Sequence, residues 1–487
     1  MAFDYDVVII GGSPAGRYAA VTATQLRAKV ALVEPAQRQG VAARSPLQDL
    51  LTPHTLSRMG LTQQLASVNQ FDVNANADAA QNRKISLPWA EAMQWSSDVV
   101  ANLEDQNSPA VLASLGVDFI QGAGQFERQP CLAFAVNGRR LLARSYLVAA
   151  GSRPAIPAIQ GLQTTGYLTA SEVWQPLTSP EPPKRWVIIG GDPNGCQLAQ
   201  TLARLGLDVA LIVSRSHILA KEDPEIAQLV QATLEAEGVR VLTATAVTQV
   251  KRIQDKKWIQ AGNKAIETDE ILLCAGQQPN VEALNLEAVG VKFYRHRLRL
   301  NLKLQTTNPR IYACGDAIGG YQFTNFSNYE ARLALKNALF FPVFKVDYQS
   351  IPWTIFSEPQ LARVGLTEAQ ARRIYGDRVL VLRQYFKTVA AAQLRDEITG
   401  ICKLIVLRNG KILGAAIVGP QAGELINLIS LAIAQRLKVD VLSDLAPAYP
   451  SLSEIFDQIA AEYRKASLNC NPLLQNLLEG FFNFRRS

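Results

Sequence analysis

Short apolar runs and longer amphipathic stretches alternate along much of the chain. Apolar runs at residues 5–10 and 186–189 each lead into a glycine-rich turn and then a helical pattern. Residues 117–148 and 245–274 instead have the pattern of short strands joined by hairpins. The Asn137-Gly138 pair in the first of these ranges is typical of a hairpin turn. Strand, turn and helix in this order are typical of a doubly wound sheet. The pattern therefore predicts an α/β fold with two Rossmann-like dinucleotide-binding domains.

A third region of the pattern lies toward the C-terminus. Apolar runs at residues 402–407 and 412–418 precede a helical pattern at 422–436, which predicts a separate α+β domain. Prolines within residues 177–184 indicate a linker. The expected domains are a first dinucleotide-binding domain at 1–150, a second at 151–280, the remainder of the first at 281–349, the α+β domain at 350–465 and a tail at 466–487.

Length, charge and cysteine usage narrow the class of protein. A chain of 487 residues suits about three domains of roughly 100–200 residues each. The net charge of +7 comes mostly from scattered basic residues, so we expect no nucleic-acid partner. No apolar run reaches the ~18 residues of a membrane span, and no basic leader precedes Tyr5. The six cysteines are solitary, without the spacing of a metal site or disulfide framework, which favours a cytoplasmic protein.

The first glycine-rich turn carries the chemistry of a dinucleotide site. It consists of Gly11, Gly12, Ser13, Pro14, Ala15 and Gly16. The outer glycines allow a tight turn and close helix–strand packing, and the helix N-terminus attracts a pyrophosphate. Ser13 replaces the usual middle glycine with a small hydroxyl that can donate to phosphate. Glu34 ends the next apolar run, where an acid accepts the ribose hydroxyls.

Further motifs follow in order: AAGSRP at 149–154, LCAGQQPN at 273–280, TNPRIYACGD at 307–316, and the segments 358–359 and 364–368. This series resembles the pyridine nucleotide-disulfide oxidoreductases, the family of dihydrolipoamide dehydrogenase, glutathione reductase and mercuric reductase. The resemblance runs from about residue 4 to 460 and implies a homodimer that binds FAD in the first domain. It assigns Asp316 to the ribityl chain of FAD. The other FAD contacts that it implies are Gly124, Ala150, Gly151, Ser152 and Gly315.

The cysteine pair of that family has no counterpart. Members with disulfide chemistry carry CxxxxC shortly after the acid that corresponds to Glu34. Residues 40–48 of this chain read GVAARSPLQ, and its first cysteine is Cys131. Without a thiolate at this position there is no nucleophile and no dithiol relay. The sequence therefore predicts flavin chemistry without a redox disulfide.

Two other family positions are also replaced. The family's C-terminal His–Glu pair corresponds to Tyr449 and Glu454. A tyrosine, with an ordinary pKa of about 10, is a poor base at neutral pH. Tyr449 is therefore either a packing residue or a hydrogen-bond donor to the acceptor, oriented by Glu454. The Lys–Glu pair beside the flavin corresponds to Gln48 and Gln197, a neutral pair that can still hydrogen-bond.

The second glycine-rich turn combines opposing signals. It runs from Gly190 to Gly195 and has Asp192 at the middle position, where a carboxylate opposes a pyrophosphate. Arg215 and His217 follow the next strand, which lacks a terminal acid and so resembles sites that bind the 2′-phosphate of NADPH. Arg215 is equally explained as a solvated loop residue. The sequence favours NADPH, with Gly190, Gly195, Gln197, Arg215, His217 and Gly276 as expected contacts.

The tail extends beyond the resemblance. Asn471-Pro472 is a typical helix start, and the leucines and phenylalanines from Leu473 to Phe482 fall on one face, with Arg485 and Arg486 at the end. Docking on the protein's own dimer and peripheral contact with a membrane both explain such a face.

Together these features predict an FAD-dependent oxidoreductase that passes electrons from NADPH to a thiol-free small acceptor such as a quinone. Two other classes remain open. One is a non-catalytic FAD-binding protein with a structural, sensory or docking role, in which Asp192 closes the nicotinamide site. The other is a flavoprotein reduced by a protein donor.

Overall fold

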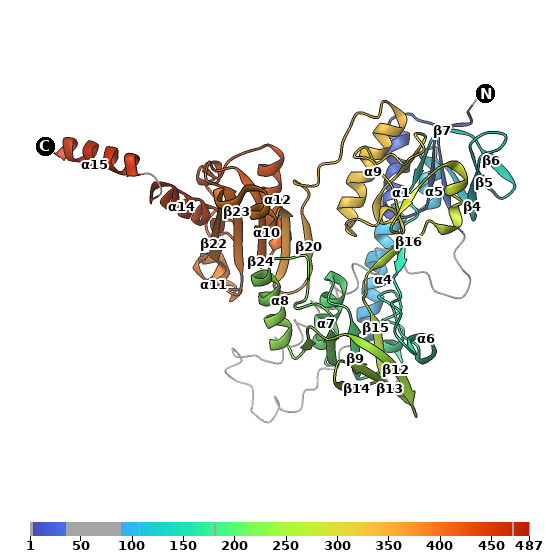
Figure 1. Ribbon diagram of the computed structural model, residues 1–487, viewed down its shortest axis with the longest axis horizontal. Coiled ribbons are helices and arrows are strands. Elements are labelled where there is room, and N and C mark those ends of the chain that lie inside the picture. The colour runs from blue at the N-terminus through green and yellow to red at the C-terminus, as the bar shows by residue number, and fades with distance from the viewer. Residues whose placement is uncertain (1–2, 36–88, 107, 180–181, 470–471, 487) are drawn as a thin grey trace. The chain divides into compact units, whose positions relative to one another are not determined.

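The computed structural model describes residues 3–35, 89–106, 108–179, 182–469 and 472–486 (Figure 1). The chain divides into two compact units. The N-terminal unit comprises Met1–Ile212 with Ala246–Val346, and the C-terminal unit comprises Val213–Thr245 with Asp347–Ser487. Each unit is described by itself below.

A five-stranded parallel sheet organises the first part of the N-terminal unit. Its order is β19 (Ile311–Ala313), β7 (Ala143–Val148), β1 (Tyr5–Ile10), β2 (Val30–Glu34) and β3 (Asp118–Gln121). Helices α1 (Pro14–Gln25) and α9 (Thr324–Leu339) lie side by side on one face of this sheet (Figure 1). Alanines such as Ala19 and Ala23 keep α1 close to β1 and α9 because they add little bulk. The predicted Rossmann-like domain is confirmed here.

The opposite face of the sheet is covered by a small antiparallel sheet. Strands β4 (Gly124–Glu127), β5 (Ala133–Val136) and β6 (Arg139–Leu141) pair in that order. Phe126 and Phe134 from this sheet share a core with Val8 and Ile10 of β1. The predicted hairpin turn at Asn137-Gly138 is confirmed, because both residues adopt positive φ angles, 50° and 73°. Helices α4 (Trp89–Asp105) and α5 (Pro109–Ser114) precede β3, while residues 36–88 lie outside the described ranges.

The second βαβ unit also forms as predicted. Parallel strands β10 (Asp208–Ile212), β9 (Arg185–Ile189) and β15 (Glu270–Leu273) flank one another, and α7 (Pro193–Arg204) connects β9 to β10. An antiparallel sheet follows, made of β12 (Val247–Ile253), β13 (Lys256–Ala261) and β14 (Lys264–Thr268). These three strands are the predicted hairpins.

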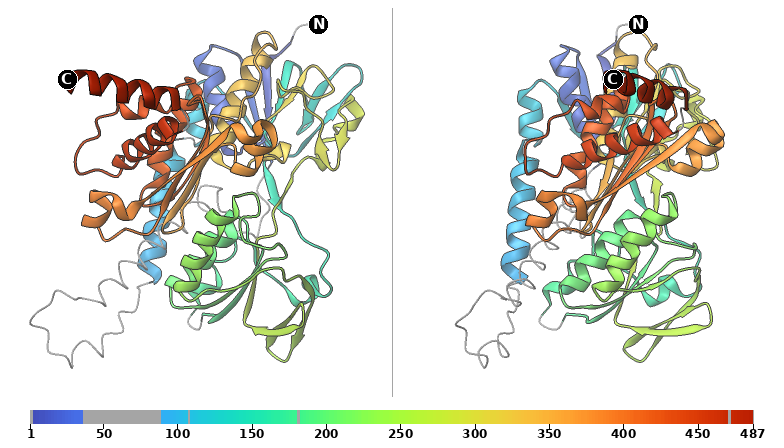
Figure 2. Two further views of the ribbon diagram at one scale, coloured as in Figure 1. Left: turned by 60° about the vertical axis from the view of Figure 1, so that its left-hand side comes forward. Right: turned by 90° about the vertical axis from the view of Figure 1, so that its left-hand side faces the viewer.

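A five-stranded antiparallel sheet organises the C-terminal unit. Its order is β20 (Trp353–Ile355), β21 (Gln360–Gly365), β24 (Ile412–Gly419), β23 (Ile401–Leu407) and β22 (Val379–Tyr385). Helices α12 (Ala422–Ala434) and α14 (Glu454–Asn469) cover one face; Figure 2 shows these red helices beside the orange strands. The period of two explains the layers, because Cys402, Leu404 and Val406 face these helices while Ile405 packs with Ala371 on the other face. The expected α+β domain is confirmed.

On that other face, Lys403 is a buried charge with three acidic partners. Its Nζ lies 3.0 Å from Asp223 and 2.8 Å from Glu368, and it also contacts Glu225. Glu225 lies in the first turn of helix α8 (Pro224–Ala236), and Glu368 begins α10 (Glu368–Tyr375). The lysine side chain is only 2% exposed, so this cluster ties both helix starts to β23.

Short elements complete the described structure. They are α6 (Leu162–Thr165), α11 (Ala390–Leu394), α13 (Asp440–Ser443), β8 (Ser152–Pro154), β11 (Arg240–Leu242), β16 (Gln277–Pro279), β17 (Phe293–Tyr294) and β18 (Arg297–Leu298). The predicted tail helix is α15 (Pro472–Arg486). Within the described ranges, no helix combines the length and the hydrophobicity needed to cross a membrane.

Candidate functional site

The first glycine-rich turn joins β1 to α1 and leaves no room for side chains at its outer glycines. Gly11 has a φ of 114°, and a Cβ there would overlap the carbonyl of Ala149 on the adjoining segment. A Cβ at Gly16 would overlap the carbonyl of Gly11. The backbone therefore bends tightly and brings the N-terminus of α1 directly against the sheet, which is the geometry of a pyrophosphate cradle.

Ser13 caps that helix. Its Oγ accepts a hydrogen bond from the Gly16 N–H at 3.3 Å and donates one to the Ala149 carbonyl at 2.7 Å. Pro14 occupies the first helical position, where a missing N–H costs nothing. Ala15 is buried and continues the packed side of the helix. The hydroxyl is neutral, so the positive end of the α1 dipole remains available to an anion.

Glu34 lies beside this turn at the end of β2. Its carboxylate occupies the space that a side chain at Gly12 would need. Arg17, which the sequence reasoning missed, places Nη2 at 3.1 Å and 3.2 Å from the two carboxylate oxygens and donates from Nε to the Gly12 carbonyl. A basic residue immediately after the last glycine was the available signal. Arg17 thereby holds Glu34 against the turn.

Two further turns converge on the N-terminus of α1. A Cβ built on Gly151 would lie 3.8 Å from the Cβ of Ser13, and one on Gly315 would lie 3.4 Å from the Cβ of Ala15. Ser152 bridges these turns by donating from Oγ to Asp316 Oδ2 at 3.0 Å. Burial raises the pKa of Asp316, and this hydrogen bond opposes the rise. The structure therefore brings together most of the residues expected around FAD, with the half-buried Ala150 preceding Gly151.

A buried acid fixes the Gly315 turn and was not foreseen. Glu330 on α9 is 1% exposed, and its Oε2 accepts a hydrogen bond from the Gly315 N–H at 2.7 Å. A lone acid inside an alanine-rich helix gave no sequence signal for this role. Glu330 positions the turn and, through it, Asp316.

Two expected FAD contacts have a different status. Gly124 begins β4, where a Cβ would approach the ring of Phe134 and the Ala135 carbonyl, so packing against β5 requires a glycine. Gln48 lies outside the described residues. Its expected partner Gln197 is 7% exposed within α7.

The second turn repeats the geometry of the first. Gly190 has a φ of 118°, and a Cβ there would overlap the carbonyl of Cys274. A Cβ at Gly195 would overlap the Gly190 carbonyl. Asp192 caps α7, and its Oδ1 accepts a hydrogen bond from the Gly195 N–H at 2.8 Å. Gly276 follows Cys274 by two residues and has a φ of 99°. No neighbouring atom lies within 4 Å of the position that its Cβ would occupy.

The other expected nicotinamide contacts belong to the C-terminal unit. Arg215 is exposed in the segment after β10. His217 is half-buried, and its Nδ1 lies 2.7 Å from the carbonyl oxygen of Ile218. The ring is therefore oriented by its own backbone.

Tyr449 and Glu454 lie near the start of α14. Tyr449 is 79% exposed. Glu454 Oε1 accepts a hydrogen bond from the Ser451 N–H at 2.8 Å, an arrangement that caps the helix. The carboxylate of Glu454 therefore bonds to the backbone N–H of Ser451 at the start of the helix.

The described cysteines are free thiols. Cys196, Cys274, Cys314 and Cys402 are buried, and Cys131 is half-buried. Burial raises the pKa of Cys402 to about 12 and raises the pKa values of the other three well above the usual range. Asp192 adds to the rise for Cys196 and Cys274, which lie beside the second turn.

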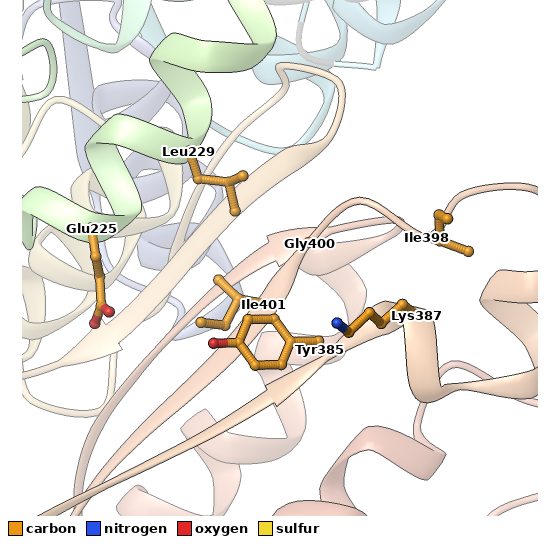
Figure 3. Close-up of a pocket in the computed structure, with 7 residues that line it drawn as sticks. All are labelled: Glu225, Leu229, Tyr385, Lys387, Ile398, Gly400 and Ile401. Carbon is orange, nitrogen blue, oxygen red and sulfur yellow. The ribbon is translucent and has the colours of Figure 1, made fainter.

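A cavity of about 320 Å³ lies in the C-terminal unit (Figure 3). It is lined by Glu225, Leu229, Tyr385, Lys387, Ile398, Gly400 and Ile401. The carboxylate of Glu225 is already engaged by Arg383 and Lys403. The cavity includes none of the residues of either glycine-rich turn, so we assign it no part in nucleotide binding.

Two dinucleotide turns on parallel strands, followed by an antiparallel domain, define the class of two-nucleotide flavoprotein oxidoreductases. Residues 5–331 match the family described as pyridine nucleotide-disulphide oxidoreductase, and residues 351–460 match its dimerisation domain. The chain belongs to this family. Its members are FAD-dependent oxidoreductases that use NAD(P)H, and the dimerisation domain supports a homodimer.

Individual relatives cover nearly the whole chain. Mercuric reductase from Staphylococcus aureus is 30% identical over 476 residues, which is 96% of this chain and 84% of that protein. Dihydrolipoyl dehydrogenase from Bacillus subtilis (strain 168) is 29% identical over 453 residues, covering 92% and 96% of the two chains. The structure of the HOCl-induced flavoprotein disulfide reductase RclA from Escherichia coli is 25% identical, with a TM-score of 0.78 and coverage of 94% and 99%.

Proposed function

We propose that this protein is an FAD-dependent oxidoreductase that passes electrons from NADPH to a non-disulfide acceptor such as a quinone. The observation that carries the proposal is the placement of its cysteines. The segment after Glu34 contains no cysteine before Cys131. The four buried thiols have raised pKa values, so they are poor thiolate nucleophiles. Acceptors that require a thiol relay are therefore disfavoured.

The residues at the first turn fit FAD. The turn formed by Gly11 and Gly16 brings the N-terminus of α1 to the edge of the sheet, where its N–H groups would bind the pyrophosphate of FAD, and Glu34 would accept ribose hydroxyls. Asp316, which accepts a hydrogen bond from Ser152, would bind the ribityl chain. Bound FAD supplies a ring that accepts a hydride and releases electrons singly or in pairs. The protein positions that ring and controls which molecules reach it.

The donor and acceptor sites follow from the remaining residues. The second turn, with Gly190, Gly195 and Gly276, would bind the nicotinamide dinucleotide. The sequence favours NADPH over NADH, because the strand after this turn lacks a terminal acid. The hydroxyl of Tyr449, exposed near α14, would hydrogen-bond the acceptor. This role needs no proton transfer from a group with an ordinary pKa of about 10.

The test is an anaerobic titration of the purified holoprotein with NADPH and then NADH, followed by flavin absorbance near ~450 nm. NADPH should bleach the flavin faster than NADH does. The reduced protein should then be reoxidised by short-chain quinones but not by lipoamide or glutathione disulfide. Turnover with either disulfide would overturn the proposal. Absence of bleaching, with FAD bound, would favour the non-catalytic or protein-reduced alternatives instead.

A lipid surface is consistent with a quinone acceptor. On α15, Leu473 is 82% exposed and Phe484 is 78% exposed. The helix ends in Arg485 and Arg486 and carries Glu479 as its acid, so its charge complements an anionic headgroup layer. We propose that α15 contacts the membrane peripherally. Sedimentation with anionic vesicles, lost on truncation after Asn469, would support this contact; a truncated chain that turns monomeric would indicate docking within the dimer.

A further inference from the structure

The two glycine-rich turns form a matched pair within one chain. At both turns the first glycine has a φ near 115°, at 114° and 118°, and packs against the carbonyl that follows another parallel strand. At both turns the last glycine packs on the carbonyl of the first. Both helices begin with a proline, Pro14 or Pro193. A difference in what the turns bind must therefore come from side chains.

The decisive side-chain difference is at the helix cap. Ser13 offers a neutral hydroxyl 3.3 Å from the Gly16 N–H. Asp192 offers a carboxylate 2.8 Å from the Gly195 N–H. Hydrogen bonds to a carboxylate are shorter and about twice as strong as those between neutral groups. The second helix therefore carries its own anion, while the first does not.

A charged cap differs from a neutral one in its effect on a bound nucleotide. The pyrophosphate of a dinucleotide needs the free N–H groups and the positive dipole end at the start of the helix. The cap holds one of those N–H groups at both turns, Ser13 at 3.3 Å and Asp192 at 2.8 Å, so this contact does not distinguish the turns. Asp192 is half-buried, and its negative charge repels a pyrophosphate at this helix start. Burial raises the pKa values of Cys196 and Cys274, and the negative charge of Asp192 adds to the rise at these two thiols.

We propose that Asp192 is a specificity-determining residue that competes with the dinucleotide pyrophosphate for the N-terminus of α7. The first turn therefore retains FAD, while the second turn binds the nicotinamide dinucleotide weakly and releases it readily. This inference rests on the proposed function only in taking the second turn as the nicotinamide site. It goes further by assigning the weak affinity to one carboxylate.

Two substitutions remove the charge and keep a side chain that caps the helix. Asp192→Asn keeps a side chain that caps helices as well as aspartate does but removes the charge. Asp192→Ser reproduces the cap of the first turn. Asp208→Asn is the matched control, because it removes an exposed carboxylate from the start of β10. The reciprocal change is Ser13→Asp, which installs the carboxylate at the first turn.

The experiment measures binding of NADP⁺ to the oxidised holoprotein by isothermal titration calorimetry, which needs no turnover. We expect Asp192→Ser to tighten binding by about 10- to 100-fold and Asp192→Asn by a similar factor, since one repulsive charge of this kind is worth on that order. The difference in NADP⁺ affinity between Asp192→Asn and the natural protein should become smaller at high salt. Asp208→Asn should bind as the natural protein does. Ser13→Asp should retain less FAD through gel filtration, measured as the ratio of flavin to protein absorbance.

Equal NADP⁺ affinity in the natural protein, Asp192→Asn and Asp192→Ser would overturn the inference, as would full FAD retention by Ser13→Asp. The fate of the proposed function is read separately, from anaerobic flavin bleaching. If Asp192→Ser binds the nucleotide tightly and NADPH still leaves its flavin oxidised, the inference stands and NADPH is not the donor. If NADPH bleaches the flavin of every variant while affinities stay equal, NADPH is the donor and Asp192 does not set its affinity.

Discussion

Thiol alkylation gives a direct test of chemistry without a redox disulfide. The perturbation is N-ethylmaleimide added to protein that has first been reduced anaerobically with NADPH, the state in which a redox dithiol would be exposed. Alkylation requires the thiolate, so its rate follows the thiolate fraction and the access to sulfur. If no cysteine takes part in turnover, activity with a quinone should survive this treatment.

The structure sets the expected magnitude. A thiol with the ordinary pKa of 9.0 is about one-tenth thiolate at pH 8, whereas a pKa of about 12, as for Cys402, leaves about one part in ten thousand. That difference alone slows alkylation by about a thousandfold, and burial slows it further. Cys196, Cys274 and Cys314 also have raised pKa values and are buried.

Two cysteines need separate treatment. Cys131 is half-buried, and Cys470 lies outside the described residues. A double variant, Cys131→Ser with Cys470→Ser, retains only the four buried cysteines, Cys196, Cys274, Cys314 and Cys402. In this variant the folded protein should react with Ellman's reagent on a timescale of hours, whereas protein in guanidinium should titrate all four thiols at once. Quinone activity should stay above roughly nine-tenths of the untreated value after alkylation.

Loss of activity in proportion to the modification of one thiol, seen only after NADPH reduction, would refute this reasoning. Such a result would mean that a cysteine reaches the flavin site and is deprotonated there. Dihydrolipoyl dehydrogenase from Bacillus subtilis, treated in parallel, is the matched comparison within the family.

Further predictions concern the turns and the scaffold. Gly16→Ala should overpack the first turn at a cost of about 1–3 kcal/mol and release FAD. The matched Gly195→Ala should keep FAD but weaken NADP⁺ binding. Equal flavin content in the two variants would contradict the assignment of the turns. Lys403→Met should lower the free energy of unfolding by about 3–5 kcal/mol in urea titrations, because it removes the cation beside the buried carboxylate of Asp223, while exposed Lys411→Met should change it little. Burial alone raises the pKa of Asp269, but hydrogen bonds from Lys256 and from the backbone N–H groups of Arg185 and Lys184 outweigh it and lower that pKa from 3.8 to about 2. The ionised Asp269 therefore stabilises the fold by about 1 kcal/mol above pH 3.8, and this contribution disappears as the pH falls through 2. In Asp269→Asn, the free energy of unfolding should depend less on pH between 3.8 and 2 than it does in the natural protein. Tyr449→Phe should raise the KM for a quinone several-fold without slowing flavin bleaching by NADPH, and an unchanged KM would exclude Tyr449 from the acceptor site.

The sequence was sufficient wherever a local rule decides the structure. Gly11 and Gly190 mark positive-φ turns, and the structure gives both that conformation. The Asn137-Gly138 hairpin and the strands of the C-terminal domain follow equally from local preferences. These features depend on neighbours in sequence, so pattern alone predicts them.

Contacts between distant segments were beyond such rules. Arg17 meets Glu34 only because β1 and β2 are adjacent and parallel, and Glu330 meets Gly315 only because α9 packs against the turn that follows β19. In the C-terminal unit, Lys403 stands inside an apolar run, and its acidic partners lie on segments far away in the chain. A single sequence carries no signal for which long-range pairs meet, so these residues were found only in the folded structure.

The two turns show how a fold can keep its geometry while its chemistry changes. Both turns satisfy the same steric requirements at their glycines, so both are equally able to form. Affinity for a phosphate, however, depends on whether the helix N-terminus is free to meet it. A neutral cap at Ser13 leaves that end positive, and a charged cap at Asp192 neutralises it. We therefore attribute the expected difference between a retained FAD and a readily released nicotinamide dinucleotide to one side chain at equivalent positions of the two turns.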